Sequence, residues 1–300
     1  MKIRISLLDN IYKKISKRAV EKTLRALDYK NYYEAYKKYV IEADYGVPEN
    51  IEFDAVDNPK VSIIIAVYNQ YKLTMQCLNS IKLNAGIKDY EIILVDDCST
   101  DETLNIKEQV KNITVIRNKE NQGFLRNCNL AAKVAKGEYI YLLNNDTKVL
   151  PNAIKELVDT MEENSNIGAV GSKLVFPDGR IQEAGAKVVA KGRVRGIGAG
   201  YNPMEPIYNE LKEVDYCCGA SLMIRKNLWD NLNGFDELFC PGYYEETDLC
   251  MRITQAGYKV IYQPKSEIIH ITKQTFSEKA QKLIATNRKK FYKKWKSFIH

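Results

Sequence analysis

Short runs of branched apolar residues alternate with stretches of helical length from Lys60 onward. Val61–Val67 and Glu91–Val95 are dominated by Val, Ile and Leu, a composition typical of strands buried on both faces. We expect two more strands and three helices, at 113–116, 139–143, 71–84, 101–111 and 123–136. Strands that alternate with helices in this way predict βαβ units, and hence an α/β fold with a mostly parallel, Rossmann-like sheet and flanking helices.

The charge is unevenly spread over three predicted segments. We expect a helical N-terminal extension over 1–58, a main domain over 59–272 and a basic C-terminal helix over 273–300. Residues 1–44 carry a net charge of +5 and residues 273–300 one of +8, which leaves −6 for the middle. An acidic body argues against a nucleic-acid partner, because phosphate backbones require basic residues on the working surface.

The sequence favours a cytoplasmic location. The longest apolar run is Val61–Tyr68, far shorter than the roughly 20 residues of a membrane-spanning helix. The first residues lack a sustained apolar region and a cleavage site, so we expect no signal peptide. Seven cysteines without a CxxC pair indicate reduced thiols. The basic, aromatic-rich C-terminal helix suits peripheral contact with the inner face of the cell membrane or a solvated cap on the domain. The tyrosine-rich N-terminal helices suit a homodimer contact or a cover for the sheet.

Three polar loops follow predicted strands, beginning at Tyr68, Asp96 and Asn144. Ligands of such sheets bind at the carboxyl ends of the strands, so these loops should converge on one crevice. Asp97 and Asp146 would there repel an anionic ligand unless a divalent cation stood between them. For Ser99, Thr100 and Asp101 (99–101), helix capping and ligand contact are equally open interpretations.

Two common nucleotide sites are excluded. A dinucleotide-binding fold places GxGxxG after its first strand, where this chain has Tyr68-Asn69-Gln70-Tyr71, and the chain has no P-loop. These observations leave a metal-bound diphosphate as the ligand that fits the acidic loops.

From Val61 to His270 the motifs resemble glycosyltransferase family 2 enzymes of the GT-A fold. The opening strand ends in Tyr-Asn, Val95–Asp101 is similar to the family's nucleoside-binding loop, and Asn121-Gln122-Gly123 matches its next signature. The resemblance implies a UDP- or dTDP-sugar donor, with Asp97 holding the base. The implied nucleotide-binding residues are Ala66, Tyr68, Asn69, Asp97, Asn121, Gly123, Asn129, Asn144 and Asn145.

The family's DxD motif is here Asn144-Asn145-Asp146, so its first carboxylate is replaced by an amide. The resemblance implies that Asp146, with His270, binds Mg²⁺ or Mn²⁺, and the Leu-Asn-Asn-Asp-Thr variant is similar to rhamnosyltransferases and other surface-polysaccharide enzymes. The segment that lines the sugar and acceptor site is implied to include Cys218, Gly219 and Ala220.

Three acids occur within four residues, at Glu245, Glu246 and Asp248. Such crowding raises at least one pKa, which suits a base that takes a proton from an acceptor hydroxyl. An acidic helix start stabilised by the helix dipole is the alternative. The resemblance assigns Glu246 as the catalytic base, with Glu245 preceding it and Asp248 beginning a helix.

These patterns predict an inverting, metal-dependent transferase of a single hexosyl or rhamnosyl unit, since the QxxRW motif of processive synthases is missing. The expected acceptor is a glycan or a lipid-linked molecule of the cell envelope. Two alternatives remain: a catalytically silent nucleotide-sugar-binding module, favoured by the missing DxD carboxylate, and a nucleotidyltransferase, which would need a Gly-rich basic loop after the first strand.

Overall fold

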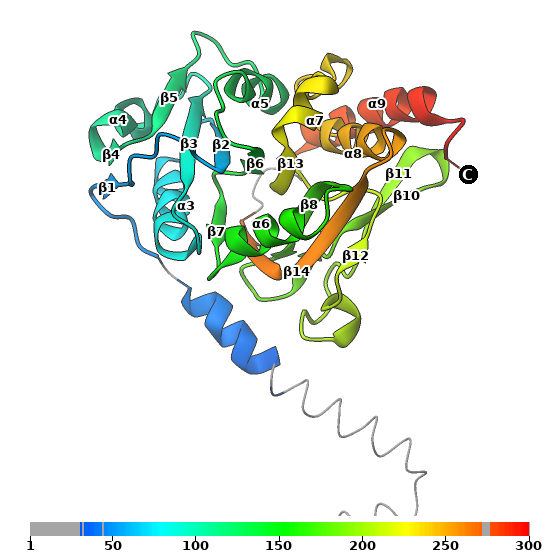
Figure 1. Ribbon diagram of the computed structural model, residues 1–300, viewed down its shortest axis with the longest axis horizontal. Helices are drawn as coiled ribbons and strands as arrows, with labels where there is room; N and C mark the ends of the chain where they lie inside the picture. Colours follow the sequence, from blue (N-terminus) through cyan, green and yellow to red (C-terminus); the bar gives the residue numbers. More distant parts are fainter. Residues whose placement is uncertain (1–30, 32, 44, 272–276, 300) are drawn as a thin grey trace, which may run out of the picture.

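A mixed ten-stranded sheet forms the centre of the molecule (Figure 1). The computed structural model describes residues 31, 33–43, 45–271 and 277–299, and all counts here refer to them. One half of the sheet is parallel, with β5, β3, β2 and β6 side by side. These strands span Thr114–Arg117, Tyr90–Asp96, Val61–Val67 and Tyr139–Leu143.

The other half of the sheet is mixed. β13 is antiparallel to both β6 and β8, and β8 is parallel to β14. β7 and β12 pair with β14, and β9 with β8. β1 pairs with β4, and β10 with β11, outside this sheet. These strands span Ile51–Glu52 (β1), Val110–Lys111 (β4), Thr147–Val149 (β7), Ile167–Val175 (β8), Ile181–Glu183 (β9), Ala186–Val189 (β10), Arg193–Gly196 (β11), Lys212–Glu213 (β12), Ser221–Arg225 (β13) and Lys259–His270 (β14).

Helices cover both faces of the sheet, and each face has its own apolar core. Helices α3 and α6 contribute Met75, Leu78, Ile154 and Leu157 to one core. The other core contains side chains from α5, α7, α8 and α9, among them Phe291. These helices span Tyr71–Asn84 (α3), Phe124–Ala132 (α5), Ala153–Glu163 (α6), Lys226–Asn231 (α7), Glu245–Gln255 (α8) and Glu278–Trp295 (α9).

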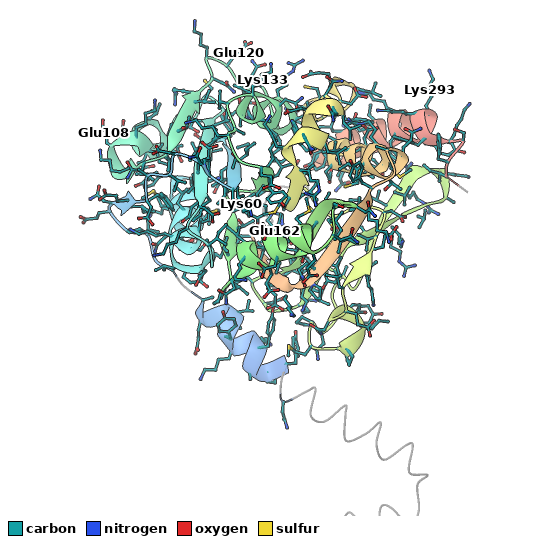
Figure 2. All side chains as sticks on the ribbon, viewed as in Figure 1. Lys60, Glu108, Glu120, Lys133, Glu162 and Lys293 are labelled. Atoms are coloured by element: carbon teal, nitrogen blue, oxygen red, sulfur yellow. The ribbon has the colours of Figure 1, made fainter. Side chains whose placement is uncertain are left out.

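Ion pairs link the elements at the molecular surface. Lys60, which directly precedes β2, pairs with Glu162 in the last turn of α6 (Figure 2). Lys293 extends outward from α9 in the same view, on the face of this helix that does not contact the core.

Most predicted elements are confirmed, including β2 and α3 with the bounds expected from the sequence. The helix expected over 101–111 is wrong in length, because a 3₁₀ turn at Glu102–Asn105 leads into a single α-helical turn, α4 (Ile106–Gln109), and β4 follows. The predicted helix at 123–136 is shorter, ending at Ala132.

The described part of the N-terminal segment packs against the main domain more closely than the predicted division suggests. Residues 33–42 are helical, and Val40 packs against Leu150 and Val175. Ile51 and Phe53 belong to the core beneath α3, so the expected boundary at 58/59 falls inside this packed unit. The remaining expectations for 1–30 lie outside the described residues.

Candidate functional site

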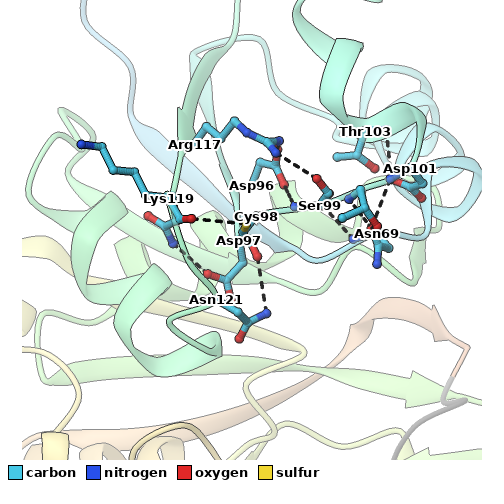
Figure 3. Close-up of polar contacts among 12 residues, drawn as sticks. Asn69, Asp96, Asp97, Cys98, Ser99, Asp101, Thr103, Arg117, Lys119 and Asn121 are labelled. Atoms are coloured by element: carbon cyan, nitrogen blue, oxygen red, sulfur yellow. Dashed lines mark hydrogen bonds and ion pairs between the residues drawn. The ribbon is translucent and has the colours of Figure 1, made fainter.

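The carboxylate of Asp97 anchors the loop that follows β5. Its Oδ1 accepts hydrogen bonds from the Asn118 side chain at 2.8 Å and the Gln122 N–H at 2.7 Å, and its Oδ2 accepts the Gly123 N–H at 2.9 Å. The Asn121 side chain donates to the Asp97 carbonyl at 3.4 Å (Figure 3). The structure thus brings Asp97, Asn121 and Gly123 together as expected. Since Asp97 is only 3% exposed, most of its hydrogen-bonding capacity holds this loop.

Asn69 joins the loop after β2 to the loop after β3 (Figure 3). Its N–H donates to the Ser99 hydroxyl at 2.7 Å, and its side-chain oxygen accepts the N–H groups of Thr100 at 2.7 Å and Asp101 at 3.3 Å. Asn69 has φ 56°, a left-handed conformation that Asn tolerates better than most residues. Asp101 accepts the Thr103 N–H at 3.1 Å and caps the 3₁₀ turn, so capping is the observed role of Asp101.

Two further nucleotide-site candidates flank this junction. Ala66 is the penultimate residue of β2 and pairs in register with Val95 of β3. Tyr68 follows the strand, and 49% of its surface is exposed. Its ring is therefore accessible at the carboxyl end of the parallel strands, where ligands of such sheets bind.

Asp146 and His270 form the part of the site that can hold a cation. The Asp146 Oδ1 lies 3.2 Å from the His270 Nε2, and 23% of the Asp146 side chain is exposed. The His270 Nδ1 lies 3.1 Å from the Gln182 amide oxygen, an outer contact that orients metal-binding histidines. Within the described ranges, no group of three or more His, Cys, Asp and Glu is suited to a metal. One oxygen and one nitrogen donor fit a divalent ion whose other ligands come from a diphosphate and water.

The two asparagines of the DxD variant point in different directions. The side-chain nitrogen of Asn144 lies 3.3 Å from the His270 Nε2. The backbone N–H of Asn144 donates to the Ala220 carbonyl at 3.1 Å. The Asn145 amide instead donates to the Thr74 hydroxyl of α3 at 3.0 Å. Asn144 therefore lies beside the cation-binding pair, whereas the observed contact of Asn145 ties the loop to a helix.

Glu245 and Glu246 open α8 beside the segment that the sequence assigns to the sugar. A Cβ built on Gly219 would lie 3.5 Å from the Glu246 Cβ, which places this backbone against the acid. Glu245 is 4% exposed, and one carboxylate oxygen of each glutamate is buried without a hydrogen-bond partner within the described chain. Burial is the main cause that raises the pKa of both carboxyls, and for Glu245 the neighbouring Glu246 charge adds to it. The expected repulsion thus contributes to the raised pKa of Glu245, but burial is the larger cause.

Asp248 lies outside this group, which corrects its prediction as a catalytic residue. Its side chain is fully buried. The Trp295 indole N–H donates to its Oδ1 at 2.8 Å, the Lys294 ammonium lies 2.7 Å from the same oxygen, and Arg252 pairs with its Oδ2 at 2.7 Å. These partners occupy the carboxylate and leave no face open to a substrate.

Asn129 is also a structural link between two segments of the chain. Its side chain accepts the Phe235 N–H and donates to the Phe235 carbonyl, both at 2.9 Å. The amide thereby joins α5 to the segment before α8. Its predicted contact with a nucleotide is not what the geometry favours, since both ends of the amide are used.

Glu183 and Gln182 were missed by the sequence prediction, although both contact residues of the site. The Glu183 carboxylate accepts the Cys218 N–H at 2.8 Å. Burial raises the pKa of Glu183 to about 7, with the Cys218 N–H opposing and the charge of Glu246 adding to the shift. A detectable signal was the Pro177-Asp178-Gly179 turn, which is typical of a hairpin and here connects β8 to β9.

The candidate site therefore combines anchored loops at the strand ends, the Asp146–His270 pair and the two glutamates that open α8. A model of the family described as "Glycosyl transferase family 2" matches residues 62–232. The chain belongs to this family. Its resemblance to glycosyltransferase family 2, stated from the motifs, is confirmed.

The sequence is similar to that of a curated relative over most of this chain. The O-antigen biosynthesis protein RfbC of Myxococcus xanthus is 29% identical over 232 residues, which cover 73% of this chain but 18% of RfbC. The chain thus spans about a fifth of the length of that family member. Within the described residues, no helix has the length and apolarity needed to cross a membrane.

Solved structures show the same GT-A fold. GalNAc-T7, crystallised with UDP, GalNAc and Mn²⁺, gives a TM-score of 0.61 at 19% identity, covering 76% of this chain and 47% of that one. Staphylococcus aureus TarS 1–349 in complex with UDP-GlcNAc gives a TM-score of 0.57 at 19% identity, covering 80% and 73%. The α/β fold with a GT-A sheet and flanking helices, predicted from the sequence, is confirmed.

Proposed function

We propose that this family 2 glycosyltransferase moves one sugar from a UDP- or dTDP-sugar to an acceptor hydroxyl, with inversion, during assembly of a cell-surface polysaccharide. The observation that carries the proposal is the pair formed by the buried Glu245 and the half-buried Glu246, which lies against Gly219. The name of RfbC, an O-antigen biosynthesis protein, supports the polysaccharide context. The UDP-GlcNAc complex of TarS supports a nucleotide-sugar donor.

The anchored loops at the strand ends would bind the nucleotide. The exposed ring of Tyr68 offers an apolar face to a base, and Asp97 offers its remaining acceptor capacity to a base N–H. Asp146 and His270 would hold Mg²⁺ or Mn²⁺, which would offset negative charge on the departing diphosphate. The Mn²⁺ in the GalNAc-T7 structure supports a divalent metal, without choosing between these two ions.

Glu246 would take the proton of the acceptor hydroxyl. Burial raises the pKa of both glutamates, and that of Glu245 lies well above its ordinary value. A carboxyl that retains its proton leaves a single negative charge on the pair, which Glu246 then carries. Raising the pKa of a carboxylate makes it a stronger base while it can still ionise near neutral pH.

A silent binding module is the second candidate, because two amides precede Asp146 and the described donor set is small. Normal nucleotide binding without turnover would favour it. We also propose that exposed lysines of α9 and of the turn that follows it contact an anionic membrane surface, since Lys289, Lys293 and Lys296 are all exposed. A homodimer stays a prediction.

The direct test is nucleotide release from a panel of UDP- and dTDP-sugars, with and without Mn²⁺ and with a mixture of lipid-linked and oligosaccharide acceptors. Release from one donor should require the metal, and Glu246→Gln should lower kcat about a hundredfold or more. Glu213→Gln, an exposed change on β12, is the matched control. Full activity of Glu246→Gln would refute its assignment as the base.

A further inference from the structure

The C-terminal helix α9 holds the loop that leads into the carboxylate pair. Asn287 on α9 is fully buried. Its amide nitrogen lies 2.8 Å from the carbonyls of Phe239 and Gly242, and 3.1 Å from that of Tyr243. One side chain thus binds three backbone acceptors of the segment that precedes Glu245.

The asparagine is used here as a donor. Its side-chain oxygen is buried and has no partner within the described residues, which is unfavourable for a hydrogen-bond acceptor. The donor bonds must offset this cost, so the contacts with the loop explain a polar residue in this otherwise apolar position. Phe291, one helical turn further, packs on the Tyr244 ring at 5.3 Å between centroids.

The held loop has an unfavourable backbone. Tyr243 and Tyr244 have φ of 69° and 75°, a left-handed conformation that is unfavourable for bulky residues and persists only where the surroundings enforce it. Tyr244 is also the N-cap residue of α8, directly before Glu245, and its side chain makes no capping hydrogen bond. The direction in which Glu245 and Glu246 leave this loop therefore depends on contacts from outside it.

A second contact fixes the first turn of α8 itself. The Trp295 N–H and the Lys294 ammonium both bind the Asp248 Oδ1. Asn287 thus contacts the segment before Glu245 and Glu246, whereas Trp295 and Lys294 contact Asp248, which follows them. Helix α9 is therefore attached to the chain on both sides of the two glutamates. Pro241, within the same loop, lies against Gly123, where an added Cβ would come within 2.6 Å of the proline Cβ.

We infer that α9 is a positioning element of the active site, with Asn287 and Trp295 as positioning residues that orient the catalytic carboxylates through the loop and the first turn of α8. The inference rests on the proposed role of Glu245 and Glu246. It makes the C-terminal helix necessary for the rate of transfer, independently of any contact with a membrane.

The test compares Asn287→Leu with Thr286→Ala, a control at the adjacent exposed position whose hydroxyl bonds only within α9. Asn287→Leu should lower kcat about tenfold to a hundredfold, since small misplacements of a reacting group have effects of this size. The Kd of this variant for the nucleotide that the release assay produces, measured by calorimetry, should stay within about threefold of the wild-type value, because Asp97 keeps its hydrogen-bond partners. Trp295→Phe, which keeps an aromatic ring but loses the N–H donor, should lower kcat in the same way.

Amide hydrogen exchange measures the positioning without turnover. Asn287→Leu should exchange faster over 239–249 while β2 and β3 keep their protection. An unchanged kcat, or a loss of protection throughout the protein that accounts for the loss of activity, would overturn the inference. If Glu246→Gln is fully active, the proposed base is wrong, and the exchange over 239–249 then decides alone whether α9 holds this segment.

Discussion

Replacing Asp248 by Asn should reduce stability and leave the chemistry largely intact, because the asparagine oxygen can still accept the Trp295 N–H that positions α8. The carboxylate is fully buried and compensates Arg252 and Lys294, whose side chains are 14% and 28% exposed. Removing one partner of a buried ion pair costs 3–5 kcal/mol. The lower end, about 3 kcal/mol, applies here, because Lys294 keeps Asp236 as a partner. Unfolding of a chain of this size shifts by about 2 °C per kcal/mol, so Tm should fall by about 6 °C.

The assay pairs a thermal melt with the initial rate at 25 °C, where the variant stays folded. We expect a kcat within about threefold of the wild type, whereas Glu246→Gln should show the opposite pattern, with Tm preserved and turnover lost. A normal Tm with a hundredfold lower kcat in Asp248→Asn would refute this reasoning. It would restore the catalytic role that the sequence alone suggests for Asp248.

Three further predictions concern other parts of the site. Because the native Glu183 carboxyl keeps a proton that the unfolded chain releases above about pH 4.5, stability falls as the pH rises from there to about 7. Glu183→Gln should therefore gain about 3 kcal/mol over the wild type at pH 8 and nothing at pH 4 in urea unfolding; an equal difference at both pH values would contradict this. Gln182→Leu should weaken Mn²⁺ binding about tenfold in calorimetry with nucleotide present, because the amide oxygen of Gln182 orients the His270 ring. An unchanged Mn²⁺ affinity would exclude that role for Gln182. Gly123→Ala should weaken nucleotide binding about tenfold or more by calorimetry, because it combines a φ of +82° with the contact to Pro241. Gly257→Ala, with φ +88° and open space around it, is the control for backbone strain, and an equal loss of binding in both would exclude the steric explanation.

The parallel half of the fold was predictable because its signals are local. Runs such as Val61–Val67 alternate with helical stretches, and the strand-end rule then places Asp97 and Asp146 at one edge. Most of the mixed half was not predicted as strands, although β8 is buried throughout and β13 over four of its five residues. Their pairing joins segments that are distant in the sequence, and their order in the sheet follows from tertiary packing rather than from any local pattern.

The proposed metal ligands show a similar division. Asp146 and His270 were named from a motif resemblance, whereas Gln182 contacts His270 from β9, a strand of three residues. Such a short strand carries almost no periodic signal. Only the Pro177-Asp178-Gly179 turn marks the hairpin, and a turn does not identify which side chain faces the site.

The acidic run at 245–248 was misinterpreted because the start of α8 was misplaced. Aspartate is a favoured helix cap, so the sequence suggested a helix beginning at Asp248 with the glutamates ahead of it. The structure begins α8 at Glu245, and residues two apart on a helix then differ by about 200° in direction. Glu246 and Asp248 must therefore face opposite sides, one toward Gly219 and the other toward Trp295. No local signal favours Tyr244 as the first cap, since it has positive φ and no capping side chain. The helix start is set by Asn287, more than forty residues further along the chain, and the assignment of the three acids depends on that distant contact.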